Sequence, residues 1–321
     1  MLPNLHSRFR RTADAALGLR SCAAILCAAA VLGLWPSPSY GQPCCAGASV
    51  LSPARLTPLD DALVGLQARG ARIVGSFDAA GRYLSAPAGA NELDLEQDLI
   101  GTLRVLQRGQ LSVSVPILQT IRTAGGTSEF GGGLGDIAVS GRYDAVLAGE
   151  YEWLPGLAIL AGVVFPTGKP LESASLPLGS DSTGTGAFQG TLGLAVEQIW
   201  GHLFANLTLL ALKSAPRHVG GISTTLGFQG TASAAGGYVF DSGGALALTI
   251  VAMRSTDAVQ DGKAVLDSSR GKTLLGMVGA FPLSARWRIQ GSLTGDLPFR
   301  SMGKNEPAGV GLSLLIMRTW Q

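Results

Sequence analysis

The sequence predicts an all-β protein, a transmembrane antiparallel up-and-down β-barrel of about twelve strands. Three observations predict it: segments of about 11 to 15 residues with alternating apolar and polar side chains, gaps that alternate short and long, and an N-terminal export signal. Each strand of a membrane barrel has one face toward lipid and one toward a polar lumen, and the two ends carry turns of unequal length. Strands of soluble sandwiches also alternate apolar and polar residues. The number of segments and the regular gaps therefore favour the membrane barrel over a sandwich.

Residues 1–41 have the features of a cleaved secretory signal. Four arginines accompany an apolar run from Cys22 to Trp35, and small residues at Ser39 and Gly41 place the cleavage site before Gln42. The run of about 14 residues is too short for a membrane helix. The signal predicts export, and with the barrel pattern it predicts the outer membrane of a Gram-negative bacterium.

The charge of the mature chain excludes some partners. The signal carries four of the 24 Lys and Arg residues and one of the 22 Asp and Glu residues, which leaves 20 basic and 21 acidic residues, a net charge near −1. This balance argues against a nucleic-acid partner. Cys44 and Cys45 offer too few ligands for a metal site, and no cofactor is expected.

The expected barrel occupies 63–321 and follows a segment, 42–62, that is interrupted by prolines. That segment is expected to be periplasmic, either as a tether or as a plug folded into the lumen. Gaps of two to eight residues alternate with gaps of ten to twenty, so the long gaps all fall at one end, as in bacterial barrels with long outer loops. The expected strands are 63–77, 93–106, 110–121, 135–147, 156–166, 187–199, 202–212, 223–239, 244–255, 272–282, 285–297 and 308–320.

Charged residues within these strands are expected to face the lumen. In the strand 93–106, charged positions alternate with leucines, and alternate positions lie on opposite faces of a strand. An Arg or Lys at the lipid midplane costs about 2–4 kcal/mol, so a row of charges belongs inside. The predicted lumen-lining residues are Asp94, Glu96, Asp98, Arg104, Asp136, Arg142, Asp144, Glu197, Arg286 and Arg288.

Short motifs between 131 and 210 resemble a known family. Gly133-Leu-Gly-Asp-Ile137, the strand end Phe165-Pro-Thr-Gly168 and the loop Gly184-Thr-Gly186 are similar to motifs of the outer-membrane family named after the phenol meta-cleavage degradation pathway. This resemblance implies a porin-like barrel that takes up aromatic or other hydrophobic compounds. Residues 309–321 resemble the C-terminal signal by which barrels are recognised for insertion, so the expected partners are the barrel-assembly machinery, outer-membrane lipid and small hydrophobic solutes.

Two functions agree with these features. The first is a channel or transporter for small hydrophobic or aromatic solutes, whose lumen is narrow or plugged because twelve strands lie between filled and open barrels. The alternative is a structural or surface-binding barrel that transports nothing. Catalysis is not expected, because neither His202 nor His218 has a nucleophile and a carboxylate beside it in the sequence.

Overall fold

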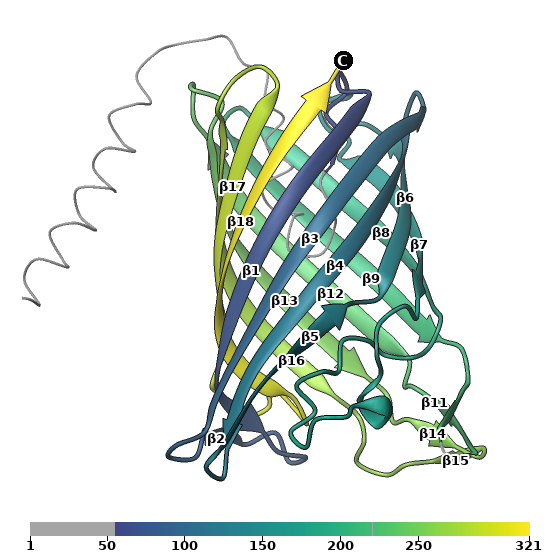
Figure 1. Cartoon of the computed structure of the whole chain (residues 1–321). Coiled ribbons are helices and arrows are strands. Elements are labelled where there is room, and N and C mark those ends of the chain that lie inside the picture. Colours follow the sequence, from purple (N-terminus) through teal and green to yellow (C-terminus); the bar gives the residue numbers. More distant parts are fainter. Residues whose placement is uncertain (1–54, 220) are drawn as a thin grey trace, which may run out of the picture. The chain divides into compact units, whose positions relative to one another are not determined.

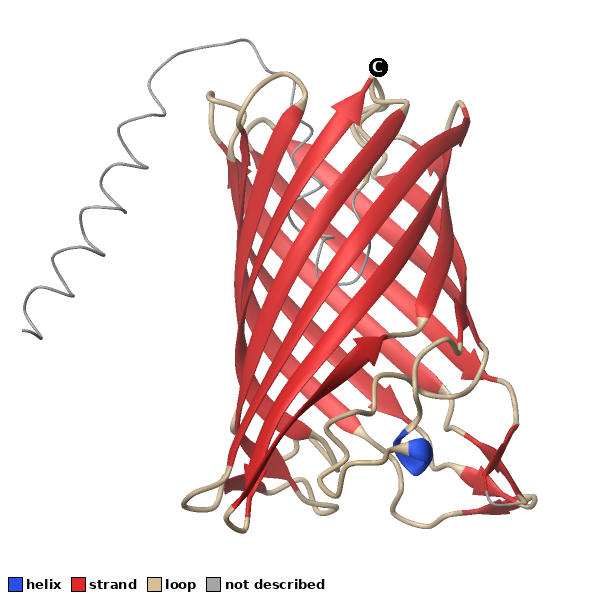
Figure 2. Ribbon diagram, viewed as in Figure 1, coloured by secondary structure: helices blue, strands red, loops and turns tan. Residues whose placement is uncertain are grey.

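The structure, a computed structural model, describes residues 55–219 and 221–321 and contains a closed twelve-stranded antiparallel barrel (Figures 1 and 2). The first strand pairs with the last over 14 residue pairs, from Ala62–Trp320 to Ser76–Pro307, and this pairing closes the sheet. The predicted fold is confirmed. The barrel strands are β1 (Ala62–Phe77), β3 (Asn91–Leu106), β4 (Gly109–Ala124), β6 (Ile137–Val146), β7 (Gly156–Phe165), β8 (Gln189–Trp200), β9 (Leu203–Ser214), β12 (Gln229–Val239), β13 (Ala245–Ser255), β16 (Gly271–Pro282), β17 (Trp287–Asp296) and β18 (Pro307–Trp320).

Short elements lie outside this sequence of strands. They are β2 (Tyr83–Ser85), β5 (Thr127–Leu134), β10 (Arg217–Val219), β11 (Ile222–Thr225), β14 (Val259–Gln260), β15 (Lys263–Ala264) and the 3-10 turn η1 (Leu171–Ser173). Within the described residues, no helix is long and apolar enough to cross a membrane. The predicted signal at 1–41, most of the segment 42–62, and the Cys44–Cys45 pair lie outside the described residues.

The barrel wall has an apolar outside and a polar inside. On β13, Leu246, Leu248 and Ile250 are 43%, 68% and 42% exposed, whereas Ala247 and Thr249 between them are buried. The same alternation runs along β3, β8 and β18. Successive side chains of a strand point to opposite faces, so the side chains buried within the barrel form its lumen.

The two ends of the barrel differ, as the gap lengths predict. The turns 107–108, 147–155, 201–202, 240–244 and 283–286 lie at the end that also carries the C-terminus. The longer connections lie at the opposite end, where β2, β11, β14 and β15 are found (Figure 1). We call these the turn end and the loop end.

Several strand ends differ by a few residues from the predicted ones, and two of these differences mark places where the chain leaves the wall. The expected strand 135–147 begins at Ile137, and the expected strand 223–239 begins at Gln229. In the second case the chain leaves the wall because Gly227 lies against the backbone of Thr256, where an added Cβ would be 1.9 Å from the carbonyl oxygen. The residues before it form β11, which pairs with β14 within the loops.

The first of these boundaries marks a break in the wall. β4 pairs with β6 from Gly109 to Ser114 and with β5 from Ile117 to Ala124. The chain between β5 and β6 kinks at Gly135, where an added Cβ would lie 2.3 Å from the side chain of Leu118. Because β7 ends at Phe165, opposite Ile137, β5 has no neighbouring wall strand on its other side.

Candidate functional site in the barrel lumen

A row of carboxylates lies along the inner face of β3. Asp94, Glu96 and Asp98 occupy alternate positions, and Arg69 on β1 is the register partner of Glu96. The Arg69 Nη2 atom lies 2.6 Å from Glu96 Oε1 and 2.8 Å from Asp98 Oδ2. One guanidinium is therefore shared between two carboxylates, which fixes the positions of all three side chains.

The row continues toward the loop end with fewer cations than anions. The Thr120 hydroxyl donates to Asp94 at 2.9 Å, and Arg122 Nη2 lies 2.6 Å from Glu92 Oε1. Four carboxylates on this face of β3 are thus accompanied by two arginines, Arg69 and Arg122. This part of the lumen carries an excess of negative charge.

Two cavities occupy the lumen around Arg69. Their volumes are about 430 Å³ and 300 Å³, and both are lined by Gln67 and Arg69, so they lie side by side. The larger volume falls within the range typical of sites for small molecules. The larger cavity is also lined by Asp94, Glu96, Lys272 and Gln290, and the smaller one by Asp98, Gln110, Arg142 and Thr208.

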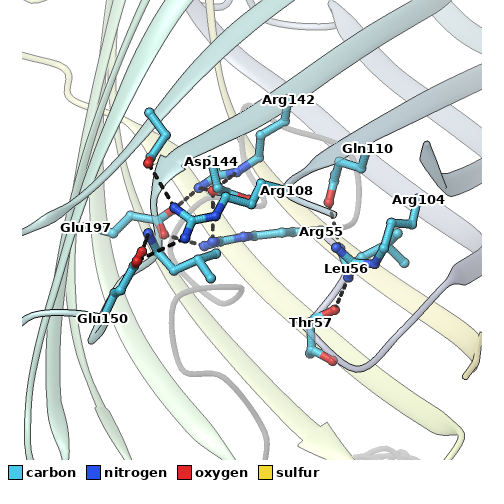
Figure 3. A network of polar contacts seen from close by, with 12 residues as sticks. Arg55, Leu56, Thr57, Arg104, Arg108, Gln110, Arg142, Asp144, Glu150 and Glu197 are labelled. Carbon is cyan, nitrogen blue, oxygen red and sulfur yellow. Dashed lines mark hydrogen bonds and ion pairs between the residues drawn. The ribbon is translucent and has the colours of Figure 1, made fainter. Parts of the chain in front are cut away.

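A network of four charged side chains lies in the half of the lumen nearer the turn end (Figure 3). Arg142 on β6 lies 2.8 Å from Asp144 and 2.9 Å from Glu197 on β8. Arg55, which precedes β1, pairs with the same two carboxylates and lies 3.2 Å from Asp144. All four side chains are 13% exposed or less. Two cations and two anions compensate one another here, which a buried charge requires.

Residues 55–61, which we call the inner segment, are held inside the barrel by further contacts. Arg104 on β3 donates to the carbonyl oxygens of Thr57 at 2.5 Å and Asp60 at 2.8 Å. Asp60 is completely buried, accepts hydrogen bonds from the backbone and hydroxyl of Thr57, and lies 3.0 Å from Arg288 on β17. The inner segment is therefore bound to β3 and β17, which are separated in the wall by β1 and β18.

The inner segment narrows the lumen. The Leu56 backbone donates to the Gln110 side chain at 3.1 Å, and the Leu56 side chain packs with Leu63, Ile100 and Leu315. One cavity beside Arg55, Leu56 and Pro58 measures about 10 Å³, which is about the minimum that one water molecule needs. The inner segment is thus packed against the wall around Leu56.

A third cavity, an apolar groove of about 700 Å³, lies on the outside of the wall. Ser140, Gly162 and Thr191 line both this groove and the 300 Å³ lumen cavity. Gly162 is closely packed, because an added Cβ there would lie 2.7 Å from the Thr191 hydroxyl. The groove is also lined by Leu111, Val163, Phe165, Leu192 and Phe228.

The ten residues named from the sequence occupy different places. Asp136 lies at the loop end, where its carboxylate accepts from the backbone of Gly168 at 2.9 Å and of Thr185 at 2.7 Å. Arg286 lies in the turn before β17 and is exposed, so it belongs to neither cavity nor network. Asp94 and Glu96 line the larger cavity, Asp98 and Arg142 the smaller one, Asp144 and Glu197 complete the network, and Arg104 and Arg288 hold the inner segment.

Several residues of the site were not named from the sequence. Gln67 and Arg69 could have been found, because they are polar residues at alternate positions on one face of β1. Arg55 and Asp60 could not, because they precede the first strand and their partners lie on distant strands.

A loop of residues 166–186 lies against β5 at the loop end. The Thr183 hydroxyl donates to the carbonyl oxygen of Leu134 at 2.7 Å, and the carboxylate of Glu129 accepts from the backbone of Leu178 at 3.0 Å. Inside the loop, Lys169 and the Ser175 hydroxyl donate to Asp181 and hold the pKa of its carboxyl far below the usual range. The open side of β5 is thus covered by a well-bonded loop.

The described residues contain no group of three or more His, Cys, Asp or Glu side chains positioned to hold a metal ion. His202 lies at the turn end, where its ring stacks on Tyr238 at a centroid distance of 5.3 Å and bonds to the carbonyl oxygen of Val239. His218 lies in β10, in the loops. The two described histidines are therefore not brought together.

The sequence matches no described protein family and no curated protein. The fold is similar to the crystal structure of an outer membrane channel from Pseudomonas putida F1, with a TM-score of 0.70, 16% identity, and coverage of 84% of this chain and 100% of that one. The β domain of the Bordetella autotransporter BrkA gives a TM-score of 0.47 at 11% identity, covering 81% and 100%. The CymD monoaromatic hydrocarbon channel gives 0.40 at 8% identity, covering 88% and 94%. The first comparison alone bears on the fold, because the other two TM-scores are below 0.5.

Proposed function

We propose that the protein is an outer-membrane channel or transporter for small solutes, of hydrophobic or aromatic character. The closed barrel with an apolar outside and a polar inside supports a membrane location, because such a wall is stable only in lipid. The fold likeness to an outer membrane channel agrees with it. The proposal has no catalytic step.

In this proposal the turn end faces the periplasm and the loop end faces outward. Residues 1–41 act as the export signal, and the strand that ends at Trp320 presents the signal for the barrel-assembly machinery. Bacterial barrels have short periplasmic turns and longer outer loops, which matches the unequal ends.

The observation that carries the proposal is the course of the lumen. Cavities of about 430 and 300 Å³ lie around Arg69, and the inner segment is bonded to the wall by Arg104, Gln110 and Arg288. A purely structural barrel of this size does not need a cavity of ligand size. We infer that residues 42–62 act as a plug at the periplasmic end.

A solute that reaches the cavities has two exits, past the inner segment or sideways through the wall. The sideways exit is supported by the apolar groove, which shares Ser140, Gly162 and Thr191 with the 300 Å³ cavity. A hydrophobic solute favours the groove because lipid lies directly outside it. This preference is the reason for proposing hydrophobic or aromatic solutes, as the resemblance to the phenol-pathway family also implies.

A second candidate, a structural or surface-binding barrel, is favoured by one observation. The four charges of Arg55, Arg142, Asp144 and Glu197 are fully compensated and almost completely buried. Breaking such a network leaves a charge uncompensated and costs about 3–5 kcal/mol, so a closed lumen would be stable.

Planar-bilayer conductance separates the two functions. We compare the mature protein with a variant lacking 42–58, and check folding of both by heat-modifiable gel mobility. A channel should conduct weakly in the intact form and more strongly after deletion. A folded barrel that is silent in both forms, and whose loss from cells changes no uptake of aromatic compounds, would support the structural alternative.

A further inference from the structure

Arg318 is a cation on the outer face of the barrel. Along β18, the exposed residues Val310, Leu312, Leu314 and Ile316 alternate with inward residues, and the half-buried Arg318 occupies the next outward position. It lies three residues before the end of the chain, at the turn end. A charge in this position faces lipid headgroups rather than the lumen.

Two tryptophans flank the Arg318 guanidinium. Trp287 on β17 is the direct register partner of Arg318, and its ring centroid lies 5.8 Å from the Arg318 Cζ atom. The Trp320 ring centroid lies 4.9 Å from the same atom. Both distances are within the range of cation–π contacts. The rings fix the guanidinium and belong to an interfacial belt of the kind that locates barrels in the headgroup region.

The guanidinium has aromatic neighbours but no anion. Among residues 55–219 and 221–321, no side chain or carbonyl oxygen accepts a hydrogen bond from Arg318, and its Nε atom is buried without a partner. Its register partner on β1 is the apolar Val64. By contrast, Arg69, Arg142 and Arg288 inside the barrel all pair with carboxylates. The unmet need of Arg318 is for an anion from outside the protein.

We propose that Arg318, Trp287 and Trp320 form a binding site for the phosphodiester of one phospholipid molecule. A guanidinium binds phosphate oxygens through two parallel N–H donors, and the two indole rings provide the apolar walls against which the lipid glycerol and upper acyl chains pack. The exposed Arg286 lies in the adjoining turn, and its backbone carbonyl oxygen accepts a hydrogen bond from the Thr319 amide at 2.9 Å. The site rests on the proposed membrane location, but it does not require that the barrel conducts.

Native mass spectrometry of the purified mature protein tests the site. The protein in a neutral detergent is mixed with phosphatidylglycerol in one sample. In a second sample it is mixed with a diacylglycerol that has the same acyl chains and no phosphate. The wild type should retain one phosphatidylglycerol and no diacylglycerol. Arg318→Gln should bind phosphatidylglycerol about tenfold more weakly, and Arg318→Lys should be intermediate because it keeps the charge without the fork.

Lys213→Gln is the matched control. Lys213 is also an outward cation, but it lies on β9 at the loop end of the barrel, away from the two tryptophans at the turn end. It should retain the lipid fully. Equal retention by wild type and Arg318→Gln, or loss of the lipid on adding millimolar inorganic phosphate, would overturn the proposal. Trp287→Leu gives a second test that keeps the arginine: about threefold weaker binding supports the aromatic walls, and unchanged binding contradicts them. Conductance of the same variants is measured separately, so a silent barrel that binds lipid refutes the channel and not the site.

Discussion

The Arg288 Nη2 atom on β17 lies 3.0 Å from the completely buried carboxylate of Asp60, which belongs to the inner segment. The two residues are separated by most of the barrel sequence, so their contact ties the chain before the first strand to the next-to-last strand. Thr57 donates twice to the same carboxylate. Because the Asp60 carboxylate is buried, it depends on Arg288 and Thr57 to compensate its charge.

Replacing Asp60 should loosen the inner segment. Asp60→Asn keeps the size of the side chain but leaves Arg288 without its anion, and breaking a buried pair in this way costs about 3–5 kcal/mol. Release of the inner segment should relieve that cost and raise single-channel conductance. Asp78→Asn is the matched control, since Asp78 pairs with Arg82 in a loop and its replacement should leave the conductance unchanged. Asp60→Asn with unchanged conductance and mobility would contradict the plug.

The carboxylates of β3 should set the ion preference of the open lumen. Asp94→Asn with Glu96→Gln removes two of the four negative charges near the larger cavity and leaves Arg69 and Arg122 in place. In the form lacking 42–58, the reversal potential in a salt gradient should shift toward anion preference, because rings of charge select the ion of opposite sign. Arg286→Glu should leave the reversal potential unchanged, because Arg286 lies outside in a turn.

The wall of the barrel could be predicted from the sequence, whereas the inside could be predicted only in part. Alternation along 93–106 placed Asp94, Glu96 and Asp98 on one face, because strand geometry relates neighbouring residues directly. The inner segment has no such periodicity. The contact of Arg55 with Glu197 joins residues 142 positions apart, and it depends on how the barrel closes.

Turn and loop geometry limited the prediction at Asp136 and Arg286. Each continues the alternation of inward and outward residues of the strand that follows it, but each lies one residue before that strand begins. Asp136 lies at the kink that Gly135 makes against Leu118, and Arg286 in a turn that extends to Trp287. Parity is informative only inside a strand, and strand ends depend on close contacts that the sequence does not reveal.

The two faces of the wall should respond differently to a new charge. Leu192→Arg places a cation on the outer face, where Leu192 is 67% exposed, and should impair assembly by about 2–4 kcal/mol near the bilayer midplane. Ser140→Arg places it beside the lumen cavity, where it meets water and carboxylates, and should be tolerated better. Heat-modifiable gel mobility after refolding measures both, and equal damage would mean that the assignment of faces is wrong.

The loop 166–186 should stay closed down to strongly acidic pH. Lys169 and Ser175 hold the pKa of Asp181 well below its ordinary value of 3.8. A carboxyl group whose pKa is lower in the folded state stabilises that state above its unfolded pKa, and this stabilisation is lost as pH falls through the folded value. Hydrogen-exchange protection of the Ser175 and Leu176 amides, which donate to Asp181, should be constant from pH 7 to 4. Asp181→Asn should lower that protection already at pH 7, and a loop that opens near pH 5 would contradict this assignment.

The orientation of the barrel can be tested with two highly exposed positions at opposite ends. Leu266 lies beyond β15 in the loops and is 83% exposed, and Asp241 lies in the turn after β12 with its side chain 96% exposed. A protease site inserted after Leu266 should be cleaved on intact cells, whereas the same site after Asp241 should be cleaved only after the outer membrane is permeabilised. Because both positions are highly exposed, a difference reports the side of the membrane rather than accessibility in the fold. The reverse pattern would invert the orientation, and cleavage of both sites on intact cells would exclude a membrane-spanning barrel.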